Sequence, residues 1–343
     1  MKKFVEKYFY QSIVVGLLIV VALVSTLGYF VTNVFNIEPG YFGADRQVLL
    51  SYEDSTLTLD EGIFIAKDMQ AYYEEYYLSN KSTINWDKSY KDGKTYEDVI
   101  LDDTLLLLKQ VFLFSEYAKA NNIELTTKDL DSINADAKAY LNDNPDFVID
   151  ATGANMELLK KFYTRTAYYG KVCDEIYNKT DLTVDTEDVR QCLVAIVTIS
   201  PNDFDSPKET AEKIMERVGN GEVLTGVAEK YEAKISKTNI GPNSLEGNEL
   251  EKFCLSLKDG QCQMLEQKGT YYIVYCYQSN DQDQTAAAKE QKKEELKDKA
   301  KMDFYNELLK KSSVKFDEDA WSFINFDTPI YTSGNIKESL LTK

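Results

Sequence analysis

The sequence contains no histidine, and only 5 of its 343 residues are cysteines. Without histidine there is no Ser-His-Asp or Cys-His catalysis and no histidine-ligated metal site. The cysteines form no C-x-x-C pair, which excludes a zinc ribbon and a thioredoxin-type redox motif. The glycine-rich loops G-x-G-x-x-G and G-x-x-x-x-G-K-[ST], which bind nucleotide phosphates, do not occur. We therefore expect no cofactor and no metal.

Positive charge is also scarce. The chain has 39 Lys and Arg against 57 Asp and Glu, and its formal net charge is −18. A nucleic-acid surface needs many Lys and Arg to displace counterions, so we expect no nucleic-acid partner. Adjacent acids invite a glycosidase or cation-site interpretation, but neighbours on a helix point to different sides and are expected to be solvated. These pairs are Glu74 with Glu75, Asp102 with Asp103, and Glu294 with Glu295.

One long apolar run lies near the N-terminus, because no charged residue occurs between Lys7 and Glu38. A helix of about 24 residues spans about 36 Å, enough for a hydrocarbon core of about 30 Å. Lysines precede the run and acids follow it, so the positive-inside rule predicts a cytoplasmic stub at 1–7, a transmembrane anchor at 8–37 and an extracytoplasmic remainder. A cleaved signal peptide is the alternative. It is disfavoured by the length of the run and by the lack of an A-x-A site.

The rest of the chain changes character once. Apolar spacing of three and four predicts helices over 59–78, 96–120, 126–144 and 153–179, and the second is apolar around most of its circumference. Shorter elements follow, and a long, highly charged helix is then predicted over 284–311. The short elements comprise strands at 193–199, 235–241 and 271–277 and helices at 207–218, 223–231 and 250–257.

This order, together with several local matches, resembles the membrane-anchored foldases of the SurA/PrsA type. In that family a helical chaperone domain is interrupted by a parvulin-type peptidyl-prolyl isomerase domain. No single match is specific, but their order and spacing agree with the family. The matching segments are Ala118 to Asp129, Asp188 to Arg190, Glu209 to Glu222, Val227 to Tyr231, Leu257 to Gln261 and Gly269 to Tyr275.

The resemblance implies an α+β protein located at the cell membrane, with its C-terminal part extracytoplasmic. A helical chaperone domain over 57–183 would be completed by a returning helix at 284–326. A parvulin-like domain with a four-stranded antiparallel sheet would occupy 187–280. Residues 327–343 are expected to form a flexible tail.

The chain departs from catalytic parvulins where that family has two histidines and a nearby Met and Phe. The histidine positions fall on or near Leu193 and on Tyr272, and the Met and Phe positions on Glu246 and Leu250, with Phe253 a near alternative. Twisting a prolyl bond works against a barrier of about 18–20 kcal/mol and needs an apolar slot with polar groups that stabilise the twisted amide. The candidate prolyl pocket is Cys192, Leu193, Leu250, Phe253 and Tyr272.

These departures favour an extracytoplasmic chaperone for unfolded or newly exported polypeptides, with weak or lost isomerase activity. An active peptidyl-prolyl isomerase is the alternative, and a non-enzymatic cell-envelope scaffold is a second one.

The resemblance also implies that Cys192 and Cys276 lie on neighbouring strands, where a disulfide is conceivable and buried free thiols are favoured. The 24 tyrosines include the pairs 72–73, 76–77, 168–169 and 271–272. Their rings suit either a helix and strand core or a surface that holds varied client segments, and both roles remain open.

Overall fold

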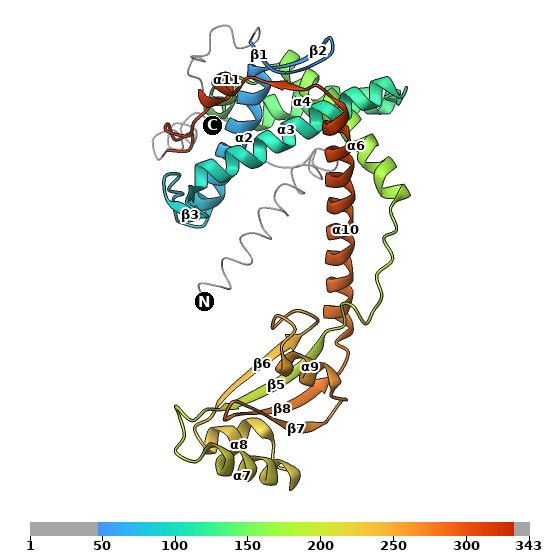
Figure 1. Ribbon diagram of the computed structural model, residues 1–343. Coiled ribbons are helices and arrows are strands. Elements are labelled where there is room, and N and C mark those ends of the chain that lie inside the picture. Colours follow the sequence, from blue (N-terminus) through green and yellow to red (C-terminus); the bar gives the residue numbers. More distant parts are fainter. Residues whose placement is uncertain (1–46, 333–343) are drawn as a thin grey trace. The chain divides into compact units, whose positions relative to one another are not determined.

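The computed structural model describes residues 47–332, so the predicted stub at 1–7 and anchor at 8–37 lie outside the described residues (Figure 1). Between residues 47 and 332 there is no helix both long enough and apolar enough to cross a bilayer. The chain forms two compact units. The helical unit comprises described residues 47–179 and 301–332, and the sheet unit comprises Thr180–Ala300.

The helical unit contains the four predicted helices, α2 Leu59–Ser79, α3 Tyr96–Ala120, α4 Thr127–Asp143 and α6 Met156–Lys179. Capping boxes in which a Thr N-cap is paired with an acid at N3 fix the starts of α2, α3 and α4. The short helix α5, Asp146–Thr152, was not predicted. It follows the helix-stopping Pro145 and ends at Gly153, whose φ of 66° suits glycine.

Short strands that the sequence did not reveal complete the helical unit. β1 Val48–Tyr52 lies between β2 Ser55–Thr58 and β9 Lys315–Phe316 in an antiparallel sheet. The strands β3 Ser89–Lys91 and β4 Lys94–Thr95 form a separate hairpin. Because β9 is only two residues long and its partner is far away in sequence, no local pattern marks it.

The C-terminal part of the chain packs into the same unit as the first helices. Phe304 of α10 Gln282–Lys311 places its ring 5.4 Å from that of Phe114 and 5.0 Å from that of Tyr117. The short helix α11, Glu318–Ser322, adds Ala320 to the core that contains Phe64. Segments near residues 114 and 304 therefore belong to one unit, as the sequence led us to expect for residues 105 and 304.

The unit boundary at residue 300 lies inside α10, whereas the sequence analysis assigned everything from residue 284 to the helical domain. The first turns of α10 belong to the sheet unit because they bind it directly. Thr285 Oγ1 accepts a hydrogen bond from the Gln191 amide at 2.9 Å, and Lys289 Nζ donates to Thr186 Oγ1 at 2.6 Å.

The sheet unit is built on four antiparallel strands in the order β6-β5-β8-β7. Three were predicted, namely β5 Cys192–Ile199, β6 Lys234–Ile240 and β8 Thr270–Gln278. The fourth strand, β7 Cys262–Gln267, was expected from the resemblance alone. It joins β8 through a two-residue turn in which Lys268 and Gly269 both have positive φ, the geometry of a tight hairpin.

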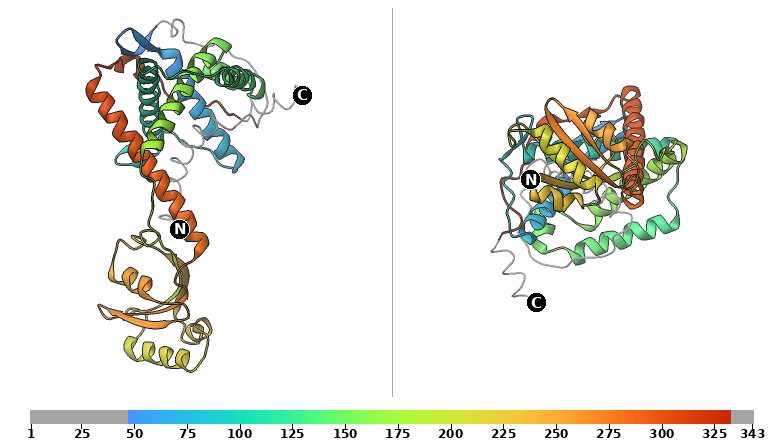
Figure 2. Two further views of the ribbon diagram at one scale, coloured as in Figure 1. Left: turned by 90° about the vertical axis from the view of Figure 1, so that its right-hand side faces the viewer. Right: turned by 90° about the horizontal axis from the view of Figure 1, so that it is seen from below.

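Helices cover both faces of this sheet. Helices α7 Pro207–Gly219 and α8 Leu224–Lys230 lie side by side over one face, where Ala195, Val197 and Ile273 are buried (Figures 1 and 2). Helix α9, Glu249–Ser256, packs on the opposite face. Successive side chains of β5 and β8 point to opposite faces of the sheet, so these two strands contribute apolar residues to the core on each face.

Candidate functional site

Four of the five predicted pocket residues lie on the sheet face that α9 covers, although Tyr272 is paired with Thr198, at the opposite end of β5 from Cys192. Cys192 stands at the start of β5, Tyr272 lies in β8, and Leu250 and Phe253 belong to α9. All four lie in one apolar cluster, which we call the α9 cluster. Leu193 is half-buried outside this cluster, because successive strand residues point to opposite faces.

The α9 cluster has a buried floor and a partly exposed rim. Its floor is Cys192, Val194, Ile196, Ile240, Cys254, Leu257, Val274 and Cys276. The rim residues Leu250, Phe253 and Tyr272 are half-buried, so apolar surface remains open to a ligand. The arrangement suits an apolar side chain laid against the end of α9.

A buried carboxylate that the sequence analysis missed positions this rim. Glu251 is 4% exposed, and it accepts hydrogen bonds from the amides of Asn243 at 2.9 Å, Leu245 at 2.8 Å and Gly247 at 3.1 Å. Burial acts to raise the pKa of Glu251, but the hydrogen bonds from these amides outweigh burial. The pKa therefore lies below its usual range. An Asn N-cap at 248 with Glu at N3 was the available sequence signal.

Glu246 does not occupy the slot, contrary to the position that the ungapped comparison suggested. It is exposed in the turn before α9 with φ of 58°. The loop is held by Glu251, which leaves the side chain of Glu246 outside the cluster.

The thiols of the cluster are structural. The five cysteines are all free, so Cys192 and Cys276 form no disulfide, and both are buried. Cys192 Sγ donates to the Ile240 carbonyl at 3.3 Å. Burial raises the pKa of Cys192, and it raises that of Cys254 to about 12 and that of Cys276 to about 11. Neutral buried thiols of this kind are poor nucleophiles.

A second apolar surface lies in the helical unit at the C-terminal end of α2. Tyr72 and Tyr76 are 37% and 54% exposed, and the exposed Leu78 follows them. The rings of Tyr76 and Tyr77 lie 5.8 Å apart, and Tyr90 of β3 stacks on Tyr96 of α3 at 4.7 Å. Burial and the neighbouring hydroxyls of Tyr96, Tyr76 and Tyr90 raise the pKa of Tyr77 to about 12. We call Tyr72, Tyr76, Tyr77, Tyr90 and Tyr96 the tyrosine surface.

The tyrosines divide between core and surface positions. Tyr73 and Tyr169 are 6% and 1% exposed and belong to the core, while Tyr72 and Tyr76 face solvent. The expectation of solvated acid pairs is wrong for Glu74, which is 7% exposed. Its carboxylate is satisfied by four donors instead of water, among them Trp86 Nε1 at 3.1 Å.

No family model and no curated protein matches the chain. Among solved structures, it is similar to the peptidylprolyl isomerase PrsA of Bacillus cereus, with 17% identity over 69% of this chain and 95% of that one, at a TM-score of 0.32. The foldase protein PrsA of Lactococcus lactis has 15% identity, coverage of 80% and 96%, and a TM-score of 0.30. A SurA-like chaperone of Campylobacter jejuni has 13% identity, coverage of 79% and 100%, and a TM-score of 0.29.

The chain is thus similar to solved structures of PrsA and SurA-like proteins, at identities of 13–17% and TM-scores of 0.29–0.32. Groups that could hold a metal or act on a prolyl bond are few among the described residues. Between residues 47 and 332, no three side chains among Cys, Asp and Glu are grouped so that they could hold a metal ion. The charged groups beside the α9 cluster are engaged elsewhere: Glu251 accepts from main-chain amides, and Arg190 donates to the carbonyls of Ser279 and Leu255.

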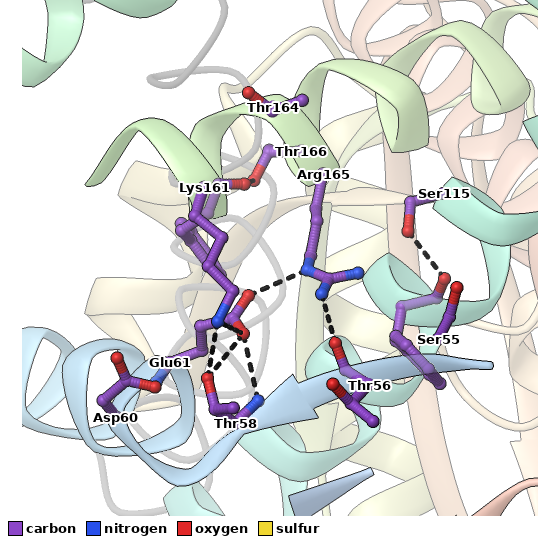
Figure 3. A network of polar contacts seen from close by, with 12 residues as sticks. Ser55, Thr56, Thr58, Asp60, Glu61, Ser115, Lys161, Thr164, Arg165 and Thr166 are labelled. Carbon is purple, nitrogen blue, oxygen red and sulfur yellow. Dashed lines mark hydrogen bonds and ion pairs between the residues drawn. The ribbon is translucent and has the colours of Figure 1, made fainter. Parts of the chain in front are cut away.

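The helical unit also contains a buried ion network (Figure 3). Glu61 is fully buried and accepts from Arg165 Nε at 2.8 Å and from Lys161 Nζ at 2.8 Å. Arg165 also donates to the Thr56 carbonyl in β2 and approaches Glu116 of α3 at 3.4 Å. The network joins α2, α3, α6 and β2, which makes it a structural device.

Proposed function

We propose that this protein is an extracytoplasmic chaperone of the SurA/PrsA foldase type that holds unfolded or newly exported polypeptides. The observation that carries the proposal is the tyrosine surface, where Tyr72 and Tyr76 expose large rings beside Leu78. Tyrosine rings offer apolar area and a hydroxyl at little cost in side-chain entropy, so they suit weak binding of varied segments. A net charge of −18 favours basic clients.

The apolar run between Lys7 and Glu38 supports a membrane anchor for this chaperone. Protease added outside intact cells tests the orientation. Digestion of the body with a protected N-terminal stub is expected, and a fully protected chain would contradict the proposal.

For the sheet unit we propose weak or no isomerase activity. The rim of the α9 cluster offers an apolar surface for a proline, which is what favours the alternative of an active isomerase. Stabilising a twisted amide also needs preorganised polar groups. The Cys192 thiol already donates to the Ile240 carbonyl, and the Glu251 carboxylate is already bonded to main-chain amides.

Suppression of aggregation tests the chaperone proposal. The full-length chain, in detergent or in bilayer discs, is mixed with reduced and alkylated lysozyme, a basic unfolded protein. We expect the double variant Tyr72→Ser/Tyr76→Ser to lose most of the suppression. Leu130→Ser, which removes an apolar side chain 47% exposed on α4, is the matched control and should behave as wild type. Equal activity of all three, or no suppression by wild type, would favour the cell-envelope scaffold.

A proline-peptide isomerisation assay tests the sheet unit. We expect the full-length chain to leave the rate close to the uncatalysed one, with no difference between wild type and Tyr272→Ala. A clear acceleration that Tyr272→Ala abolishes would establish the alternative, an active isomerase whose pocket includes Tyr272, Phe253 and Leu250.

A further inference from the structure

The end of the described chain is held inside the helical unit in an unusual manner. Residues 325–331, which we call the C-terminal strap, follow α11 without forming a helix or strand. The sequence predicts that most of this segment is a flexible tail. Its backbone is instead fixed by side chains of α2 and α3, so that prediction is wrong for residues 327–331.

The hydrogen bonds to the strap are mostly to its main chain, and the Tyr331 hydroxyl is in addition bonded to the Glu75 carboxylate. Lys67 Nζ donates to the Asn325 carbonyl, and Gln70 Nε2 donates to the Thr328 carbonyl at 2.9 Å and more weakly to that of Phe326 at 3.4 Å. Glu97 accepts from the Phe326 amide at 2.8 Å. Glu74 Oε2 accepts from the amides of Ile330 and Tyr331, each at 2.7 Å.

Two apolar sites receive side chains of the strap four residues apart. Phe326, 2% exposed, places its ring 4.6 Å from that of Trp86. Ile330, 4% exposed, is buried with Ala71, Phe147 and Val148. The sites are lined by apolar side chains and would accept other residues of similar size.

The groove that holds the strap therefore has the properties of a general peptide site. Main-chain hydrogen bonds supply affinity without reading sequence, and two apolar sites supply a loose preference. Buried polar groups such as Gln70, fully buried, and Glu74 would be costly in an empty groove, so an occupant is always needed.

We infer that this groove is a second client-binding site, and that the strap is its resident occupant. Its ligand class is an extended polypeptide carrying two apolar side chains four residues apart. The inference rests on the proposed chaperone function. Helix α2 carries the groove residues Gln70 and Glu74 on its buried face and Tyr72 and Tyr76 on its exposed face, so a client held at the tyrosine surface would reach the groove by passing around the helix.

The strap competes strongly with a free peptide, because its attachment to the same chain gives it an effective concentration of about 1 mM at the groove. A free peptide is therefore expected to bind wild type weakly. A client already held at the tyrosine surface gains the same tethering advantage and can replace the strap.

Amide hydrogen exchange on the full-length wild-type chain tests this directly. With reduced and alkylated lysozyme bound, we expect faster exchange of the Phe326, Ile330 and Tyr331 amides and unchanged exchange in β5 and β8. Binding is followed in parallel by anisotropy of the labelled client. Binding without faster exchange in the strap overturns the inference alone, and absence of binding overturns the inference together with the proposed function.

A peptide added in trans provides a second test. The peptide has the sequence of residues 323–332 and a fluorescent label, and its binding to full-length chains is measured. We expect Phe326→Ala/Ile330→Ala, which weakens the resident strap, to bind it about tenfold more tightly than wild type. Phe323→Ala, which removes a ring 63% exposed before the strap, is the matched control and should equal wild type.

A version of the peptide with Asp at the positions of Phe326 and Ile330 should not bind. Equal binding of the native peptide to the double variant and to wild type, or equal binding of the Asp version, would overturn the inference. The exchange experiment needs no variant, so it decides the matter even if the double variant fails to fold.

Discussion

At the scale of single residues, polar groups without partners are the informative exceptions. In the described part of the chain, two buried side-chain oxygens have no hydrogen-bond partner, Tyr73 Oη and Asp150 Oδ2. A buried hydroxyl that has lost water and gained no partner costs about 1–3 kcal/mol. Tyr73 is otherwise well packed, with its ring 6.2 Å from that of Trp86.

We predict that Tyr73→Phe raises the free energy of unfolding by about 1 kcal/mol, because it removes the unsatisfied hydroxyl and keeps the ring. Urea denaturation measures the change. Tyr72→Phe, at an exposed neighbour, is the matched control and should have little effect. A loss of stability in Tyr73→Phe would mean that its hydroxyl has a partner.

Asp68 provides a pH-dependent prediction. Burial raises its pKa to about 6, against the lowering effect of the Tyr140 hydroxyl, which donates to Asp68 Oδ1 at 2.7 Å. The folded state therefore binds this proton more tightly than the unfolded state does. The resulting stabilisation is complete below about pH 4 and is lost as the pH rises through about 6.

Asp68→Asn keeps an oxygen for Tyr140 and removes the charge. Above pH 6 we expect it to be more stable than wild type by about 1–3 kcal/mol, and this advantage should vanish below about pH 4. Thermal or urea unfolding across this pH range gives the comparison, with the exposed Asp131→Asn of α4 as control. An advantage that does not change with pH would refute the role of the charge.

At the scale of elements, one buried ion network ties the helices to the small sheet. Glu61 belongs to the capping box with Thr58 at the start of α2, and its carboxylate also forms an ion pair with Arg165 of α6. A buried pair contributes little net stability, but removal of one partner leaves the other charge uncompensated. The network therefore acts mainly to fix the positions of α2 and α6.

Arg165→Met should lower the free energy of unfolding by about 3–5 kcal/mol, because Glu61 loses its best-buried partner. Lys171→Met, on the same helix, breaks a more exposed pair with Asp129 and should cost about 0–1 kcal/mol. Denaturant titration of both variants makes the comparison. Similar costs for the two would show that the burial of Glu61 does not matter.

At the scale of the whole molecule, the two units differ in how much of the chain each needs. The sheet unit is one continuous segment, Thr180–Ala300. The helical unit joins residues as far apart as Lys67 and Asn325, 258 positions along the chain. Contacts between residues so far apart in sequence form slowly, because the intervening chain loses conformational entropy when its ends come together.

We therefore predict that refolding protects the amides of β5 and β8 before those of Phe316 and Ile330. Pulsed hydrogen exchange during refolding reads both sets in one experiment. Protection of Phe316 and Ile330 first would show that the helical unit does not wait for the intervening segment.

The sequence predicted well wherever structure follows from local pattern. Periodicity and capping residues located α2, α3, α4 and α6, and β-branched or aromatic runs located β5 and β8. Four of the five pocket candidates also lie on one face, because strand alternation gives Cys192 and Tyr272 the same side, but the register separates them along β5 by pairing Tyr272 with Thr198. Leu193 was misplaced by one residue, which in a strand reverses the face.

The sequence alone determined the long helices, the strands β5, β6 and β8, the absence of histidine chemistry and the acidic charge of this protein. Only the tertiary structure decided that Glu74 is buried, that Glu251 shapes the turn before α9 and that the C-terminal strap is held against α2. The reason is physical. A carboxylate is solvated or buried according to the donors that surround it, and for Glu74 two of those donors lie 256 and 257 positions away in the chain.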